Sequence, residues 1–422
     1  MSHYKDWVNE VWVDEIWAKI EKKLSVVAVR SKDKIPYTTI NGTHDNKAET
    51  DISWWTNGFW AGLMWLMYIV TKNETYKVAA ENSEVMLDRA LKDYDGLHHD
   101  VGFMWHITSG VNYRLSGNKD SKVRNMYAAN VLAGRFNLAG KFIRAWNKWD
   151  PSDFNTGWTI IDSMMNIPLL YWASKESDDP RFSYIAIAHA DTTMDMHVRP
   201  DGSVVHIVVH DHINGGKIGE ETGQGYAIGS SWSRGQAWAL YGFVLSYIYT
   251  KNEAYLDTAK KVAHYFIADL AMKDDYLPDC DLRQPKDKVV KDSSAGAIAA
   301  CGLIEIARHA GEHEKDLYLT GALWQWYPAN KRMAAPAIIG KAHPMAGWKR
   351  PDPPIGWMIT DCTPELLAAM KTGKPTTAAG EDGKRTHYFP IKTSAGDVVG
   401  ALELSDSGRP GPYERNYTMA GH

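Results

Sequence analysis

An aspartate inside an unusually apolar stretch is the first residue of this chain that could do acid–base chemistry. Residues 157–174 read GWTIIDSMMNIPLLYWAS, and Asp162 is the only carboxyl among them. We expect the stretch to form a helix buried on every side. Burial disfavours a charged carboxyl, so the pKa of Asp162 should rise until it can act as a general acid. The alternative is that Asp162 lies in a first helical turn, where the helix dipole and free amides stabilise its charge.

A second carboxyl lies in a segment rich in histidine. Residues 96–105 read GLHHDVGFMW, and Asp100 follows two histidines and precedes a Val-Gly-Phe turn. This composition places Asp100 on a connection between helices, where binding and catalytic residues are common. Together with Asp162 it would supply the pair of carboxyls that sugar hydrolysis commonly uses. The alternative is an aspartate that caps the following helix.

An arginine and a tryptophan form the third candidate group. Residues 222–241 read TGQGYAIGSSWSRGQAWALY, so Arg234 and Trp238 are four positions apart and share a helix face. An arginine at a helix start opposes the dipole, and an anionic ligand that meets both the guanidinium and the free amides would explain it. Trp238 could then stack on a sugar ring. The alternative is a surface arginine beside a core tryptophan.

Three histidines lie close together in an extended segment. His206, His210 and His212 would lie on one face of a strand, in the manner of a zinc site. No cysteine supports that reading, so we expect no metal and no cofactor, and favour a histidine that binds sugar hydroxyls. The chain also lacks a Walker loop, a Rossmann fingerprint and a GxSxG elbow, which disfavours nucleotide binding and serine-hydrolase chemistry.

The elements that position these residues form a repeat. An apolar helix from Phe59, the turn TKNE at 71–74 and a second helix recur from Gln236 with the turn TKNE at 250–253, which is 250 − 71 = 179 positions later. A looser copy runs from Ile160 to Met196. Helical hairpins with short polar turns indicate a helical array that is either open or closed into a ring.

The apolar helices of this array should form its inner layer. They are expected at 60–70, 160–172 and 236–249, with more charged helices such as 253–269 outside them. The alternating segment 203–211, followed by Asn-Gly-Gly, predicts a small β-hairpin at the rim.

Composition restricts the class of partner. A net charge of -4 on 422 residues gives no electrostatic case for nucleic acid or an anionic membrane. The 18 tryptophans and 21 tyrosines against 9 phenylalanines suit carbohydrate rings, although a large helical core would also take them. No apolar run has the form of a signal peptide or a membrane span, and three widely spaced cysteines fit a cytoplasmic protein. No pattern indicates an oligomeric state.

Six strings, in order, resemble one family. HHDVGF, IIDSMMNIPLLYWAS, the His206 hairpin, TGQGY, SWSRGQAWALYG and DSSAGAIAACGLIE resemble the unsaturated glucuronyl hydrolases, glycoside hydrolase family 88, over residues 25–310. The resemblance implies an all-α (α/α)6 barrel with a small β-hairpin at the rim. It also implies a substrate, an oligosaccharide made by a polysaccharide lyase, whose non-reducing end is a 4,5-unsaturated uronic acid.

The resemblance also implies roles for individual residues. Asp162 would deliver a proton to C4 before water adds at C5, and Asp100 would be the second catalytic carboxyl. The residues that would contact the substrate are His99, Trp55, Trp146, His206, Gln224, Arg234 and Trp238. Two alternatives stay open, which are an unsaturated rhamnogalacturonyl hydrolase acting on pectin fragments and a non-catalytic helical ring that binds carbohydrate.

The chain departs from the family pattern in two places. Gly223 stands where the family often has histidine, which puts the preference among oligosaccharides in doubt. The closing helices of the family are absent, and residues 311–422 hold 11 of the 18 prolines. We therefore expect a catalytic domain over 1–312 and an atypical tail over 313–422, either poorly ordered or unlike the family.

Overall fold

Helices that follow one another in the chain pack as antiparallel pairs in this computed structural model, which describes residues 10–148, 154–273, 275–287, 290–325, 376–379, 385–392 and 398–405. The pairs are α4 (Phe59–Thr71) with α5 (Glu74–Asp93), α6 (Ser109–Ser116) with α7 (Lys119–Ala133), α8 (Pro168–Ser177) with α9 (Arg181–His197), α10 (Ser233–Thr250) with α11 (Glu253–Ala271), and α12 (Ser293–His309) with α13 (Glu312–Trp324). The expected all-α architecture of helical hairpins is confirmed.

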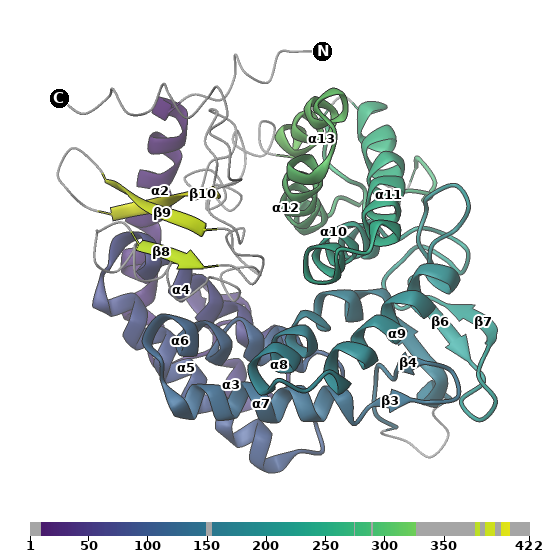
Figure 1. The fold of residues 1–422 in the computed structure, drawn as a ribbon, viewed down its shortest axis with the longest axis horizontal. Coiled ribbons are helices and arrows are strands. Elements are labelled where there is room, and N and C mark those ends of the chain that lie inside the picture. The colour runs from purple at the N-terminus through teal and green to yellow at the C-terminus, as the bar shows by residue number, and fades with distance from the viewer. Residues whose placement is uncertain are drawn as a thin grey trace.

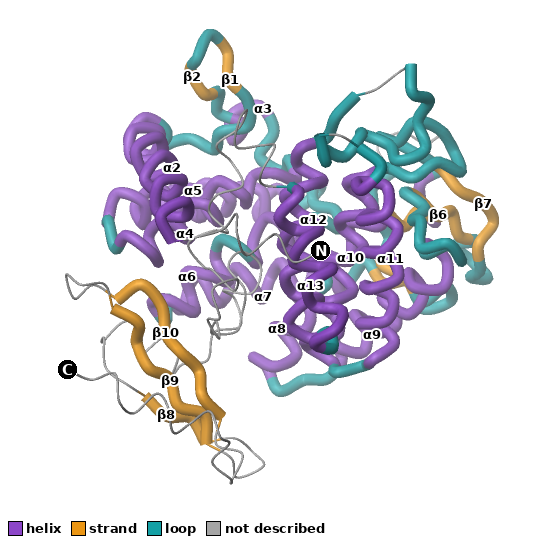
Figure 2. The backbone as a smooth tube through the Cα atoms, turned by 90° about the horizontal axis from the view of Figure 1, so that it is seen from above, coloured by secondary structure: helices purple, strands orange, loops and turns teal. Residues whose placement is uncertain are grey.

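The hairpins follow one another around an arc. It begins with α2 (Glu10–Arg30), which packs on α5, and it ends at α13 on the opposite arm (Figure 1). Within the described ranges α2 and α13 share no extensive contact, so these helices form an open arc. The short helix α3 (Lys47–Thr50) lies beside the hairpin of β1 (Thr39–Ile40) and β2 (Thr43–His44) (Figure 2).

Helix α10 is the centre of the packing. It buries nearly every side chain from Ser233 to Ser246 and contacts α8, α9, α11 and α12. Helix α11 instead alternates buried with exposed positions, as an outer helix does. The expected inner and outer layers therefore hold for this pair.

The repeated turn has a specific backbone geometry. Helices α4, α6, α8 and α10 each end on a residue in the left-handed region, with φ between 53° and 73°, and these residues are Lys72, Gly117, Asp178 and Lys251. In three of the four turns the next residue is an asparagine that caps the following helix: Asn73, Asn118 and Asn252. A left-handed residue ends one helix and the asparagine starts the next, which is why the TKNE turn recurs.

The expected single helix over 157–174 is wrong. The segment forms the strand β5 (Trp158–Ile160), a 3-10 turn (Ile161–Met165) and only then α8. Pro168 occupies the first turn of α8, where its missing N–H costs nothing. The β-branched residues before it pair with β6 instead, although the predicted burial is correct. Asp162 therefore lies in a connecting turn and not on an inner helix.

The predicted β-hairpin is confirmed. Strands β6 (Ile207–His210) and β7 (Lys217–Glu221) are antiparallel, and β5 adds to the β6 edge. The turn passes through Gly215 and Gly216 at φ of +81° and +85°, a conformation that favours glycine. A second small hairpin, β3 (Phe136–Asn137) with β4 (Phe142–Ile143), lies on the same side of the molecule (Figure 1).

The helical core includes α13 (Glu312–Trp324), and the expected domain boundary at residue 312 stays a prediction. Helix α13 buries Tyr318, Leu319 and Leu323 against the main core. Further on, β10 (Val398–Ser405), β9 (Arg385–Lys392) and β8 (Thr376–Ala379) form an antiparallel sheet in that order, and Figure 2 shows it apart from β6 and β7. The remainder of the tail at 313–422 lies outside the described residues.

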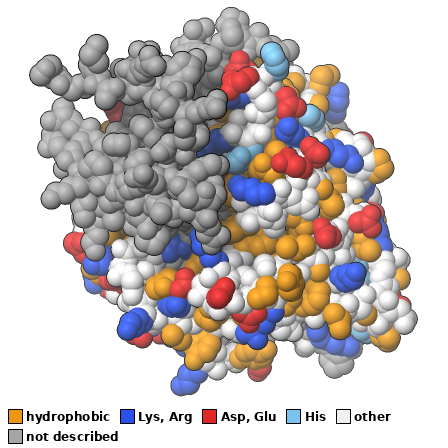
Figure 3. Space-filling model, viewed as in Figure 1, with side chains coloured by type: hydrophobic (Ala, Val, Ile, Leu, Met, Phe, Trp, Pro, Cys, Tyr) orange, Lys and Arg blue, Asp and Glu red, His pale blue; other side chains and the backbone are white. Residues whose placement is uncertain are grey.

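The described surface carries both signs of charge. On the face in Figure 3, lysines and arginines are interspersed with aspartates and glutamates, and neither sign forms a continuous field there. Among the helices that the structure describes, none is both long enough and apolar enough to cross a bilayer.

The geometry of the repeated turn predicts a stability effect. Asn118 accepts hydrogen bonds from the backbone N–H groups of both Asp120 and Ser121. Asn118→Ala should lower the free energy of unfolding by about 1 kcal/mol, measured by urea denaturation. Asn130→Ala removes an exposed side chain in the last turn of the same helix and should change it by less than about 0.5 kcal/mol. Equal losses in both variants would contradict the capping role.

Candidate active site

Asp100 and Asp162 come together although they are far apart in the sequence. Asp100 precedes a π-helical turn (Gly102–His106), and Asp162 lies in the 3-10 turn after β5. The side chain of Asn166 joins them, because its Nδ2 donates to Asp100 Oδ1 at 3.0 Å and to the Asp162 carbonyl oxygen at 3.2 Å. Strand β5 and the loop before Gly102 therefore bring the two carboxyl-bearing residues to one place.

Asp100 is held in its charged form. Burial alone would raise the pKa of its carboxyl, but the neighbouring His99, His98 and the Asn166 amide outweigh burial and lower it. Its Oδ2 lies 3.2 Å from His98 Nδ1 and 3.4 Å from His99 Nε2. The predicted position on a connection is correct, and the carboxylate binds these side chains instead of capping a helix.

Asp162 is held in its neutral form. Burial first, and then the negative charge of Asp100, raise the pKa of its carboxyl well above the ordinary value, while Arg234 opposes them. Its Oδ1 is buried and has no hydrogen-bond partner among the described residues. The alternative with a stabilised charge at a helix start is therefore not what forms. Two carboxyls whose pKa values are pushed apart are the arrangement of a general acid beside a fixed anion.

Arg234 lies at the start of α10, where the sequence predicts it. Its Nε and one terminal nitrogen contact Asp292 Oδ2 at 3.0 and 2.9 Å. Asp292 in turn caps α12, since its Oδ1 accepts from the N–H groups of Ser294 and Ala295. The guanidinium is thus fixed by the neighbouring helix. Its charge opposes the rise in the pKa of Asp162 and contributes to the lowered pKa of His206.

His206 presents a defined donor. Its Nδ1 accepts from the Gly223 N–H at 3.1 Å, so the ring proton lies on Nε2. Burial and the charge of Arg234 lower the pKa of His206 to about 3, which keeps the ring neutral. Gln224 lies on the same loop, where its side chain is exposed and its N–H lies 3.4 Å from the same Nδ1.

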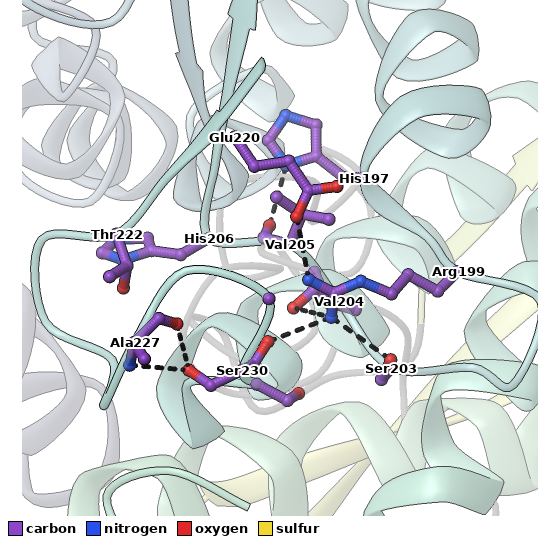
Figure 4. A network of polar contacts seen from close by, with 12 residues as sticks. His197, Arg199, Ser203, Val204, Val205, His206, Glu220, Thr222, Ala227 and Ser230 are labelled. Atoms are coloured by element: carbon purple, nitrogen blue, oxygen red, sulfur yellow. Dashed lines mark hydrogen bonds and ion pairs between the residues drawn. The ribbon is translucent and has the colours of Figure 1, made fainter. Parts of the chain in front are cut away.

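The loop that carries Gln224 is anchored at both ends. Arg199 donates to the Ser230 carbonyl at 3.0 Å and to Glu220 at 3.1 Å, so it ties the loop to β7 (Figure 4). The buried carboxyl of Asp281 accepts from the N–H groups of Tyr226 and Ser231. Figure 4 shows His206 beside Thr222 within this network.

Aromatic rings extend from the carboxyl pair. Phe103 packs between Trp55 and Trp238, with ring centroids 5.6 and 5.2 Å away. Trp238 is 4% exposed, which matches the sequence alternative of a core tryptophan and leaves little of its face for a sugar. Trp55 and Trp146 are half-buried, and Trp146 lies against Trp158. Part of each of these two rings is therefore exposed.

The predicted histidine group does not form. Only 207–210 is strand, so the three rings do not share a face. His206 lies against Trp232, His210 stacks on Phe142, and His212 is exposed. Within the described ranges, the side chains whose donor atoms are close enough to share a metal ion are His98, His99 and Asp100, within 4.8 Å. The two histidines contact the Asp100 carboxylate, so these contacts account for the cluster.

A layer of buried histidines supports β5. His197 Nδ1 donates to the Val205 carbonyl, so its Nε2 accepts from Thr159 at 2.8 Å, and Thr159 accepts from His210 Nε2 at 2.9 Å. His189 likewise accepts from the Ile143 N–H and donates from Nε2 to Ser163, the neighbour of Asp162. These bonds fix the strand and turn that carry the acid.

Sequence reasoning missed several residues of the site. Asn166, Asp292 and Phe103 were not singled out, although each lies inside a string that was. The signal for Asn166 was present, because it is a polar residue in an apolar run, four positions after Asp162. Its partners are remote in sequence, and no spacing rule reveals them.

Comparisons with known proteins show which proteins this chain resembles. No protein-family model matches the chain. The chain is 37% identical to an unsaturated glucuronyl hydrolase of Bacillus sp. strain GL1, covering 62% of this chain and 69% of the relative. It is 34% identical to an unsaturated chondroitin disaccharide hydrolase of Streptococcus pneumoniae, covering 63% and 67%. A crystal structure of unsaturated glucuronyl hydrolase from Bacillus sp. GL1 matches with a TM-score of 0.67 and 33% identity, over 75% of this chain and 82% of that one.

The charge of Asp100 should be measurable at Asp162. Because that charge raises the pKa of Asp162, Asp100→Asn should lower it. A protonated carboxyl gives an infrared band, and the band that disappears in Asp162→Asn belongs to Asp162. The change of this band with pH gives the pKa of Asp162. An unchanged or higher pKa in Asp100→Asn would show that the two carboxyls do not interact.

The histidine layer predicts a loss of stability in acid. Burial lowers the pKa of His197 to about 3 and of His210 to about 4, so an unfolded chain binds protons below about pH 6.5 that the folded chain refuses. The free energy of unfolding should therefore fall as the pH is lowered from about 6.5 to about 3. His210→Gln keeps a donor for Thr159 and should reduce the slope by up to about 1.4 kcal/mol per pH unit. His212→Gln, at an exposed site, is the control, and an equal change there would contradict the assignment.

Proposed function

The chain belongs to the unsaturated glucuronyl hydrolase family, and from that premise we propose that it is a glycosidase acting on oligosaccharides made by polysaccharide lyases. It would release the 4,5-unsaturated uronic acid from the non-reducing end. The observation that carries the proposal is that Asn166 joins two buried carboxyl-bearing residues whose pKa values are displaced in opposite directions, upward at Asp162 and downward at Asp100.

The reaction follows from that pair. Asp162 gives its proton to C4 of the C4=C5 double bond, and positive charge develops at C5 and the ring oxygen. The fixed negative charge of Asp100 favours this cation. Water adds at C5 and returns a proton to the Asp162 carboxylate, which restores the acid. The hemiketal formed at C5 then rearranges and releases the rest of the sugar.

Substrate contacts follow from the fixed donors. We assign the uronic carboxylate to the Arg234 guanidinium, and hydroxyl contacts to His206 Nε2 and to Gln224 on the neighbouring loop. His99 would contact the Asp100 carboxylate and fix its position. The half-buried rings of Trp55 and Trp146 would flank the sugar. Cys280 forms no disulfide, which fits a reducing compartment. We therefore place the protein in the cytoplasm, where imported short oligosaccharides made by lyases would be its substrates.

The function is tested by the ultraviolet absorbance of the 4,5-double bond. We expect purified protein to remove this absorbance from unsaturated chondroitin disaccharide, and to do so faster than from unsaturated rhamnogalacturonan disaccharide. The reverse order would favour a pectin-directed enzyme. Binding of either sugar with no loss of absorbance would show a non-catalytic carbohydrate-binding protein.

Asp162→Asn tests the acid. The amide cannot release a proton to C4, so kcat should fall by at least about 100-fold while the disaccharide still binds, measured by absorbance and by calorimetry. Asp120→Asn makes the same change at an exposed position of α7 and should retain full activity. A rate near that of the wild type in Asp162→Asn would exclude the proposed role.

Arg234→Ala tests carboxylate recognition. Loss of a charged hydrogen-bond donor should raise KM by at least about tenfold, with a smaller effect on kcat. Because Arg234 lowers the pKa of Asp162, the alkaline limb of the kcat profile should also move to higher pH. Arg181→Ala removes an exposed arginine that pairs with Asp179 in the turn between α8 and α9, and serves as the control. An unchanged KM in Arg234→Ala would argue against the contact.

A further inference from the structure

Asn166 is the residue through which both acid-bearing segments are connected. It is fully buried between the 3-10 turn of Asp162 and the start of α8. We propose that Asn166 is a positioning residue, whose side-chain amide holds the Asp100 carboxylate and the Asp162 backbone in one rigid unit. The inference rests on the proposed function and goes beyond it to a residue that touches no substrate.

The orientation of the Asn166 amide is fixed by its partners. The backbone N–H of Phe103 points at Asn166 Oδ1 at 2.7 Å, and an N–H group can only donate. The atom that faces Phe103 is therefore the oxygen, and Nδ2 faces Asp100 Oδ1 and the Asp162 carbonyl. All three bonds are satisfied in this one orientation.

The chemistry of these contacts requires an amide. The position needs one acceptor and two donors, and asparagine supplies them in a single plane. An aspartate could still accept from Phe103, but its second oxygen would face Asp100 Oδ1, acceptor against acceptor. Two carboxyls at that distance share one proton, so one of them acquires a strongly raised pKa.

The opposite side of the contact is closed by a glycine. A Cβ on Gly102 would lie 2.6 Å from Asn166 Cα and 2.7 Å from its Oδ1. Real side chains do not approach so closely, so any larger residue would displace Asn166. The π-helical turn that begins at Gly102 is thus shaped to receive this side chain.

The consequence is a link between the two titrations. The Nδ2 donor favours the charged form of Asp100, and the charge of Asp100 favours the neutral form of Asp162. Loss of the amide should therefore raise the pKa of Asp100. It should also change that of Asp162, because the Asp162 carbonyl loses its anchor and the separation of the two carboxyls is no longer fixed. If Asn166 served only packing, its replacement would change stability and leave the pKa values of Asp100 and Asp162 unchanged.

The test compares Asn166→Ala and Asn166→Asp with the wild type. For both variants we measure the pH dependence of kcat and KM on the unsaturated disaccharide, and the infrared titration of the Asp162 carboxyl. In Asn166→Ala, kcat should fall about tenfold or more with KM nearly unchanged. Its acid limb should move up by about one pH unit, since a hydrogen bond to a charged group is lost. The shift should be larger in Asn166→Asp.

A matched control separates positioning from packing. Asn112 is also buried, and its Nδ2 donates to the buried Glu84 Oε2 at 2.7 Å, outside the site. Asn112→Asp makes the same chemical change and should lower the melting temperature with no shift of the pH profile. If Asn166→Asp does not fold, Asn166→Ala, which adds neither bulk nor charge, decides the test alone.

The outcomes are distinct. Profiles and infrared titrations in the Asn166 variants that coincide with the wild type, as in Asn112→Asp, would overturn the proposal and leave a packing role. If the wild-type protein is inactive on every disaccharide, the proposed function fails. The infrared titration of Asp162 then still decides the inference, because a midpoint that moves in Asn166→Ala supports it and a fixed midpoint contradicts it.

Discussion

The charge on the buried carboxylate of Asp100 is the interaction on which the site depends. A carboxylate out of water is costly unless hydrogen bonds and neighbouring groups offset the lost hydration. His98, His99 and the Asn166 amide do so here, and the pKa falls in spite of burial. The charge that they preserve then helps to keep the proton on Asp162. One set of contacts at Asp100 therefore sets the protonation of both groups.

The fold supports this pair by fixing what lies around it. Four left-handed residues end the first helix of a hairpin, whereas the two acids lie on the connections between hairpins, which meet at Asn166. The buried histidines hold β5 and the following turn through hydrogen bonds. The tautomers of His197 and His189 are determined by a backbone carbonyl and a backbone N–H group. Asp292 and Asp281 anchor the guanidinium of Arg234 and the loop before α10. Buried polar groups are costly without partners, and these bonds supply partners for the strand, the guanidinium and the loop.

Much of this was accessible from sequence, for physical reasons. Apolar periodicity and the TKNE turns gave the helical hairpins, and the Asn-Gly-Gly turn gave β6 and β7. The apolar neighbours of Asp162 indicated the burial that is the first cause of its raised pKa, although the sequence left a stabilised charge open as an alternative. The identity of its element did not, since burial on every side is common to helices, strands and turns, and Pro168 moved the helix start.

What could not be predicted depends on contacts between remote segments. The ion pair of Arg234 with Asp292 spans 58 positions, and the bond from Asn166 to Asp100 spans 66. No local pattern encodes such partners, so the sequence left Arg234 as either a surface residue or a ligand-binding one. The histidine group failed for a related reason, because strand geometry ends at residue 210 and His212 lies beyond it.

The direct measurement is neutron diffraction from crystals exchanged into heavy water near neutral pD, which locates the deuterons on both carboxyls. The expected result is a deuteron on Asp162 and none on Asp100, with the deuterated side-chain amide of Asn166 directed at Asp100. A deuteron on Asp100, or a bare carboxylate at Asp162, would contradict the assignment of the acid and with it the proposed reaction.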